Sequence, residues 1–188
     1  MAHKRNAKNK RIILTLFIVV IIIVSFKGIL RNFFPLEYKE YIIQYSKEYD
    51  LDPNLIAAVI NTESKFSVEA KSSKGALGLM QIMPDTGIWI GETMGIENFN
   101  ADMINDPLIN IKMGCWYLNK LSNDFSGEYN LILAAYNAGP GNVTKWLNDE
   151  KYSEDGKSLL EIPFKETKNY VKKVSFGDKM YRYLYKLE

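Results

Sequence analysis

The stretch LIAAVINTESKFSVEAKSSKGALGLMQIMP, residues 55–84, starts with the apolar pattern of a buried helix and ends rich in glycine, serine and proline. Asp52 and Pro53 stand just before it. An aspartate at the N-cap followed by proline at the first helical position is a common helix start. The sequence therefore predicts a helix from Pro53 to about Ser64, followed by a long turn-bearing segment.

Glu63 lies near the end of this predicted helix, on the face that the helix should bury. It follows Ile56, Val59 and Ile60 by seven, four and three residues, which are the intervals of one helical face. A glutamate in water has a pKa of about 4.3, whereas partial burial can raise that pKa to about 6 or 7 and make the group an effective proton donor. The alternative is a solvated glutamate at a helix end, or one paired with Lys65.

The rest of the chain after Pro35 is also expected to be helical, with little β-structure, because few runs alternate with period two. Asp85 is expected to cap a short helix after Pro84. The first helix should fall within residues 36–50, and later ones at 107–122, 128–137, 142–148 and 167–186, with short helices and turns over 67–95. The expected fold class is mainly α.

The N-terminal segment has the pattern of a membrane anchor. Residues 1–11 are basic and carry no acid, and an uncharged run follows that reaches residue 30 if Lys27 extends its ammonium group to the interface. A cleaved signal peptide is the main alternative, but the stretch KGILRNFFPLE offers no suitable cleavage site. A buried core helix is a further alternative. We expect a cytoplasmic tail over 1–11, a single transmembrane helix over 12–30 and an outer domain over 36–188.

Charge and composition exclude several classes of function. Residues 1–31 hold seven of the 24 Lys and Arg, so 17 basic and 22 acidic residues remain beyond them, without the basic stripe of a nucleic-acid-binding protein. His3 and Cys115 are the only residues of their kinds. The sequence therefore offers no Ser-His or Cys-His couple in the outer domain, no zinc cluster and no intramolecular disulfide.

Three blocks of this sequence resemble the lytic transglycosylases with an SLT-type catalytic domain, the peptidoglycan-cleaving enzymes of glycoside hydrolase family 23. The blocks are ESKFSVEAKSSKGALGLMQIMP at 63–84, AYNAGPGNV at 135–143 and IPFKETKNYVKKV at 162–174, and they occur in the expected order. The resemblance extends over residues 36–188. The third block has ETK where ETR is common in the family, a conservative change unless that side chain makes a bidentate contact.

The resemblance implies a lysozyme-like fold and a reaction that needs one carboxyl group. Glu63 would protonate the oxygen between MurNAc and GlcNAc and then accept the proton of the MurNAc C6 hydroxyl, which attacks C1 and leaves a 1,6-anhydroMurNAc end. The substrate's acetamido group would stabilise the charge at C1. A hydrolytic glycosidase ordinarily uses a second carboxylate, and the acids closest to Glu63 in the sequence are Glu69 and Asp85. No metal or organic cofactor is implied.

The same resemblance assigns further residues to the substrate cleft. Each has an alternative structural role, as a loop polar residue, core filler, helix-surface residue, cap or buried pair. The expected substrate-binding residues are Ser72, Met80, Gln81, Tyr136, Asn137, Glu166 and Tyr170.

Two other functions fit the same sequence. The domain could be a muramidase that hydrolyses the same bond with water, similar to the goose-type lysozymes, or an inactive scaffold that binds glycan. In each case the expected partners are peptidoglycan glycan strands and, through the N-terminal helix, the plasma membrane. The composition, rich in Ile, Lys and Asn, fits a Gram-positive source with the domain outside the cell.

Overall fold

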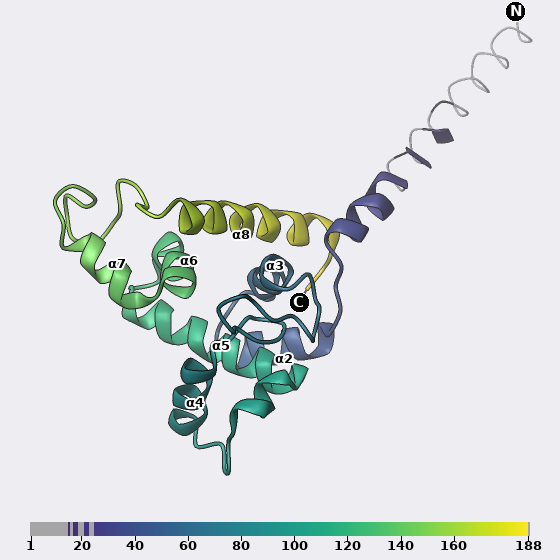
Figure 1. The fold of residues 1–188 in the computed structure, drawn as a ribbon. Helices are drawn as coiled ribbons and strands as arrows, with labels where there is room; N and C mark the ends of the chain where they lie inside the picture. The colour runs from purple at the N-terminus through teal and green to yellow at the C-terminus, as the bar shows by residue number, and fades with distance from the viewer. Residues whose placement is uncertain (1–14, 16, 19–20, 23–24, 188) are drawn as a thin grey trace, which may run out of the picture. The chain divides into compact units, whose positions relative to one another are not determined.

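The computed structural model describes residues 15, 17–18, 21–22 and 25–187, and the chain divides into two compact units, the first ending at Pro35 and the second beginning at Leu36 (Figure 1). In the first unit, residues 25–33 are helical and the side chains of Phe26 and Ile29 are exposed. Among the residues described here, no helix combines the length and the apolar character needed to cross a membrane. The predicted tail over 1–11 and much of the predicted span over 12–30 lie outside the described residues.

The second unit is built almost entirely of helices (Figure 1). In the described part of the chain, β-structure is limited to isolated bridges within residues 71–82. The sequence prediction of a mainly α fold is confirmed, and each expected helix is present with ends shifted by a few residues. The elements are α2 (Lys39–Glu48), α3 (Pro53–Glu63), α4 (Pro84–Thr93), the 3-10 helix η1 (Ala101–Asn105), α5 (Pro107–Asp124), α6 (Tyr129–Ala138), α7 (Pro140–Leu147) and α8 (Lys165–Leu184).

Helix α3 is the centre of this unit. Every residue from 54 to 61 is buried, and the longest of its packing interfaces runs along α8 (Figure 1). The two helices approach closely at Gly177 of α8, where an added Cβ would lie 3.2 Å from the Cβ of Ala58. Close approach of this kind excludes water and fixes the position of α3 against its neighbour.

The start of α3 is held by Asp52, as the sequence predicted. Its side chain accepts a hydrogen bond from the backbone N–H of Asn54 at 2.7 Å, and Pro53 takes the first helical position. Asp52 also pairs with Arg182 near the end of α8, and the Nε of Arg182 lies 3.1 Å from Asp178. The N-terminal end of α3 is thereby tied to the C-terminal end of α8.

The prediction that Asp85 caps α4 is wrong. Met83 is the N-cap residue and Pro84 is the first helical residue, so Asp85 lies within the first turn with an exposed side chain. The proline sets the start of the helix two residues earlier than an Asp85 cap would. In this position, the carboxylate favours the helix through the positive end of the helix dipole and not through a cap bond.

The turn segment after α3 is anchored to α5 by Asn110, which is fully buried. Its Oδ1 accepts the N–H of Met80 at 2.8 Å, and its Nδ2 donates to the carbonyls of Leu77 at 3.0 Å and Ile104 at 2.9 Å. Gly78 lies against this amide with a φ of +74°, and an added Cβ would overlap the Asn110 side chain. Only glycine fits there, which accounts for part of the glycine content of the segment.

We predict that Asn110→Ala lowers the free energy of unfolding by about 2 to 4 kcal/mol, because it removes three hydrogen bonds, two of which, to Met80 and Ile104, are fully buried. Chemical denaturation measures the effect. Asn119→Ala is the matched control on the same helix, since Asn119 donates only one bond, to the carbonyl of Tyr49 at 2.8 Å. Equal losses in the two variants would show that Asn110 does not anchor the segment.

Candidate active site

Glu63 is the last residue of α3, and the chain turns away directly after it. Ser64 ends the helix, and its hydroxyl donates to the carbonyl of Ile60 at 3.1 Å. Lys65 and Phe66 then adopt positive φ angles of 54° and 65°. Because the helix ends here, the Glu63 side chain projects from a rigid, buried element at the point where the chain leaves the core.

The environment of Glu63 raises its pKa from 4.5 to about 7. Burial is the largest cause, since a charged carboxylate loses hydration there. The Tyr170 hydroxyl lowers this pKa by stabilising the carboxylate, and the negative charge of Glu166 raises it. At neutral pH the group is therefore present in both its acid and its base form, which suits a residue that must donate and accept a proton.

Two tyrosines stand beside Glu63. The Tyr136 hydroxyl donates a hydrogen bond to the carbonyl of Met80 at 2.9 Å, which fixes its ring. The Tyr170 hydroxyl is buried close enough to act on the Glu63 carboxylate as a donor, although the two groups do not meet at full hydrogen-bond geometry. Burial, and then the charge of Glu63, raise the pKa of both phenols well above its ordinary value, so both remain protonated.

Two cavities are lined by residues that interact electrostatically with Glu63. The first, of about 220 Å³, is lined by residues 81–83, by Thr86 and Ile90 of α4, by Tyr117 of α5 and by residues 136–139. The second, of about 500 Å³, is lined by Lys74, residues 137–138, Asn142 and residues 163–167. Glu63 acts electrostatically on Tyr136 in the first cavity, and its own pKa responds to Glu166 in the second. Each cavity therefore has a lining residue that is electrostatically coupled to Glu63.

Asn137 belongs to both cavities and has a defined orientation. The Thr167 hydroxyl donates to its Oδ1 at 2.8 Å, which directs the amide NH2 away from α8 and leaves it to donate to a ligand. Gln81 has the opposite arrangement. Its Nε2 donates to the carbonyls of Ala70 at 3.0 Å and Gly78 at 2.9 Å, so its Oε1 remains as an acceptor. The site thus presents one fixed donor and one fixed acceptor.

Two of the residues expected to bind substrate make structural contacts. The side chain of Met80 is completely buried and packs against Gly114 of α5, so in this conformation it is a core residue whose backbone carbonyl holds Tyr136. Ser72 is half-buried, and its hydroxyl accepts the N–H of Ala76 at 3.0 Å, which closes a turn. For Met80, a direct ligand contact is not compatible with the burial.

The structure also shows residues of the site that the sequence prediction missed. Thr167 is buried and orients Asn137. Its position inside the third family-like block could have indicated from the sequence that it belongs to the site. Tyr117 lines the first cavity, and its ring centroid lies 5.6 Å from that of Tyr136. It belongs to none of the three blocks, so only the packing of α5 against α6 reveals it.

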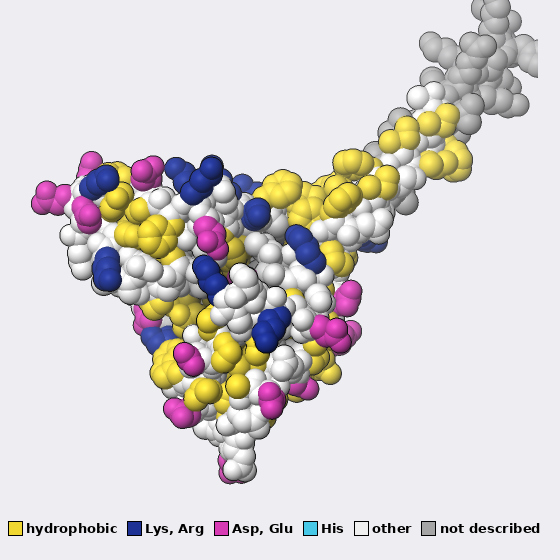
Figure 2. Space-filling view, in the orientation of Figure 1, with side chains coloured by type: hydrophobic (Ala, Val, Ile, Leu, Met, Phe, Trp, Pro, Cys, Tyr) yellow, Lys and Arg dark blue, Asp and Glu magenta, His cyan; other side chains and the backbone are white. Residues whose placement is uncertain are grey.

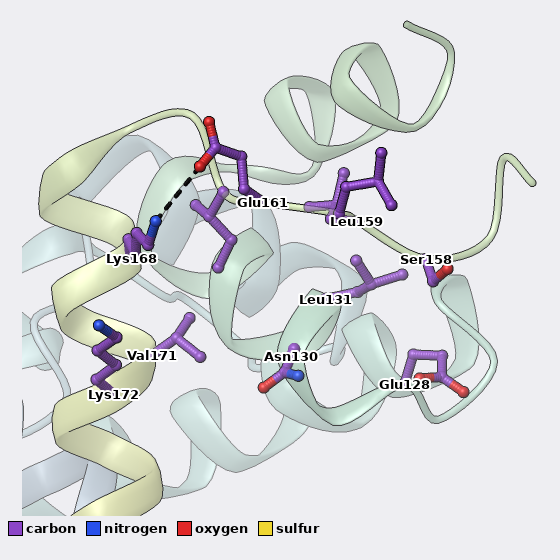
Figure 3. Close-up of a pocket in the computed structure, with 11 residues that line it drawn as sticks. Glu128, Asn130, Leu131, Ser158, Leu159, Glu161, Lys168, Val171 and Lys172 are labelled. Carbon is purple, nitrogen blue, oxygen red and sulfur yellow. Dashed lines mark hydrogen bonds and ion pairs between the residues drawn. The ribbon is translucent and has the colours of Figure 1, made fainter. Parts of the chain in front are cut away.

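Lys168, the lysine of ETK, lies outside the site around Glu63. It lines a separate cavity of about 260 Å³ between α6, α8 and residues 158–162, and its Nζ lies 3.4 Å from Glu161 (Figure 3). This single, exposed ion pair is not a bidentate contact. The departure from the family's ETR pattern therefore leaves the groups around Glu63 unchanged. Within the described residues, no cluster of His, Cys, Asp or Glu is arranged to hold a metal ion.

A mainly α fold in which a half-buried carboxyl group has a raised pKa, as the acid of lysozyme does, fits the class of lysozyme-like domains. The family model for the transglycosylase SLT domain matches residues 40–159. The chain therefore belongs to the transglycosylase SLT family and has its lysozyme-like fold.

The relatives support this assignment in sequence and in structure. The soluble lytic murein transglycosylase of Escherichia coli K12 is 36% identical over 156 residues, covering 82% of this chain and 24% of the relative. The crystal structure of the 70-kDa soluble lytic transglycosylase from Escherichia coli matches with a TM-score of 0.73 and 33% identity, over 82% of this chain and 25% of that one. An inactive glutamate-to-glutamine mutant of the lytic transglycosylase Slt from Pseudomonas aeruginosa matches with a TM-score of 0.69 and 33% identity, over 80% of this chain and 25% of that one. The chain spans about a quarter of the length of these relatives.

We predict that two substitutions move the pKa of Glu63 in opposite directions. Tyr170→Phe removes a donor that stabilises the carboxylate and should raise this pKa, whereas Glu166→Gln removes a negative charge and should lower it. Carboxyl carbon chemical shifts followed by NMR over a pH titration measure both effects. Shifts of the same sign, or none, would contradict the arrangement described here.

Proposed function

We propose that this chain is a lytic transglycosylase that cleaves the β-1,4 bond between MurNAc and GlcNAc in peptidoglycan, with Glu63 as its single acid and base. The observation that carries the proposal is a half-buried glutamate with a pKa of about 7, whose neighbours Tyr136 and Glu166 line two cavities, in a chain of the transglycosylase SLT family. The inactive glutamate-to-glutamine mutant of the Pseudomonas aeruginosa relative is consistent with it.

In this proposal the protonated Glu63 donates its proton to the glycosidic oxygen as the bond from C1 to that oxygen breaks. The acetamido group of the same sugar stabilises the charge at C1. The Glu63 carboxylate then accepts the proton of the C6 hydroxyl while the C6 oxygen bonds to C1. Glu63 recovers its starting state, and one strand ends in 1,6-anhydroMurNAc without the entry of water.

The neighbouring groups suit a glycan with N-acetyl substituents. The amide NH2 of Asn137 can donate to an acetamido carbonyl, and the Oε1 of Gln81 can accept from an acetamido N–H. The neutral Tyr170 hydroxyl can donate to the Glu63 carboxylate after the proton has left it. Glu166, exposed at the rim of the second cavity, can accept from sugar hydroxyls.

A hydrolytic muramidase is the second candidate, and Glu166 is the observation that favours it. Its carboxylate is close enough to raise the pKa of Glu63, and a second carboxylate near a catalytic acid can activate water. Its exposure on α8 favours the non-hydrolytic reaction instead, because a water-activating base is normally held in a defined geometry. An inactive glycan-binding scaffold would not require the raised pKa of Glu63.

We further propose that the domain over residues 36–188 is tethered to the outer face of the plasma membrane of a Gram-positive cell by a single transmembrane helix over 12–30, with the tail over 1–11 in the cytoplasm. The basic tail and the uncharged run support this orientation. So do the exposed side chains of Phe17 and Ile22, which are 61% and 60% accessible.

Mass spectrometry of muropeptides released from purified peptidoglycan tests the reaction. The full-length protein should release products ending in 1,6-anhydroMurNAc, and Glu63→Gln should reduce their release at least about a thousandfold, since the amide cannot donate the proton. Reducing MurNAc ends would support the muramidase, and Glu166→Gln would then abolish them. Binding to peptidoglycan without release would support the scaffold.

Cell fractionation tests the anchor. The wild-type protein should remain with membranes after an alkaline wash. Ile21→Arg combined with Ile22→Arg should move it to the supernatant, because each arginine near the middle of a span costs about 2.5 to 3.5 kcal/mol. Recovery of wild-type protein in the supernatant would contradict the anchor. Ile88→Arg, an exposed isoleucine of the second unit, is the matched control.

A further inference from the structure

A row of aromatic side chains leads away from the candidate active site across three helices. Tyr136 on α6 lies 5.6 Å from Tyr117 on α5, measured between ring centroids. Tyr117 in turn lies 6.2 Å from Trp89 on α4, and Trp89 lies 5.5 Å from Trp116 on α5. The rings meet edge to face or tilted, an arrangement that aromatic pairs prefer.

This row is continuous with the first cavity. Tyr136 and Tyr117 both line it, and so does Thr86 of α4. Trp89 follows Thr86 by about one helical turn and contacts Tyr117, so it neighbours two residues that line the cavity. Tyr136 is the member of the row on which the charge of Glu63 acts, and Trp89 is two ring contacts further away.

The outer end of the row is open to solvent. Trp89 is 40% exposed, and hydrophobic side chains reach the surface over α4 (Figure 2). The Nζ of Lys120 lies 5.9 Å from the centroid of the Trp89 ring, and Lys120 is itself paired with Asp124. The indole is therefore held by its neighbours on α5 while part of its surface stays available. A large aromatic side chain that is fixed and exposed binds partners at low entropic cost.

The face of a sugar ring is the partner that fits this surface. A pyranose face presents C–H groups with partial positive charge, which are attracted to the negative face of an aromatic ring, while the hydroxyls at its edge stay in water. The row begins at a cavity with a fixed amide donor and a fixed carbonyl acceptor, and such polar groups orient a glycan. An apolar protein partner would not need the polar groups of the cavity from which the aromatic row begins.

We propose that Trp89, together with Tyr117, forms an outer subsite for a sugar of the glycan strand that lies remote from the bond on which Glu63 acts. This inference rests on the proposed function, since it takes the occupant of the first cavity to be a glycan. Because Tyr117 lies between Trp89 and Tyr136 in the row, a dimer can bind beside Tyr136 without lying on Trp89, whereas a hexamer can cover both. The subsite therefore favours long strands over short ones.

Calorimetric titration with β-1,4-linked GlcNAc oligomers tests the subsite. The full-length protein carries Glu63→Gln in every case, so that no ligand is consumed. Trp89→Ala should weaken binding of the hexamer by about tenfold, the effect of losing one aromatic contact, and leave binding of the dimer unchanged. Trp89→Phe should retain most of the affinity for the hexamer. Ile88→Ala is the matched control, since Ile88 is 41% exposed on the same helix and belongs to neither cavity.

Three results would overturn the proposal. They are unchanged hexamer binding in Trp89→Ala, equal losses for hexamer and dimer, and an equal loss in Ile88→Ala. The first would leave the surface to a protein partner, and the other two would indicate a structural effect on α4. The outcome is separate from that of the proposed function, because hexamer binding needs no catalysis. If hexamer binding depended on Trp89 but no 1,6-anhydroMurNAc products were released from peptidoglycan, the proposed subsite would stand and the proposed transglycosylase reaction would be rejected.

Discussion

Removal of water from the Glu63 carboxyl group is the constraint on which the site depends. Burial raises the pKa of this group to about 7, and the Tyr170 hydroxyl offsets only part of the effect. The burial follows from the packing of α3 along α8, which brings Tyr170 and Glu166 to the end of α3. The ties from Asp52 to Arg182 and from Asn110 to the turn segment keep the surrounding elements in place. The raised pKa of Glu63 thus depends on the packing of α3, α8 and the turn segment together.

This arrangement has a cost in stability that depends on pH. In the unfolded chain Glu63 has a pKa near 4.5, whereas in the folded chain the pKa is about 7, so the folded state binds the proton more tightly. The contribution of Glu63 to stability is therefore favourable at low pH and is lost as the pH rises from about 4.5 to 7. A stability cost of this kind is typical of catalytic sites, where the environment that function requires lowers the stability of the fold.

The sequence predicted the framework better than the details of the site. Asp52 and Pro53 marked the start of α3, and helical spacing placed Glu63 on a buried face, because caps and periodicity are local properties. Tyr117 and the use of Met80 as a core residue were not predictable in this way. Both depend on how α5 packs against α6 and the turn segment, a long-range arrangement that no local pattern encodes. Asp85 was misplaced because Pro84 already fixed the helix start.

The most direct test of the central claim is the pH dependence of the initial rate of product release from peptidoglycan. If the half-buried Glu63 must be protonated to begin the reaction, the rate should fall as the pH rises through about 7, with the apparent pKa of Glu63. Glu166→Gln should shift this fall to lower pH, because it removes a charge that raises the pKa. A wild-type rate that stays constant from pH 6 to pH 9 would contradict the account.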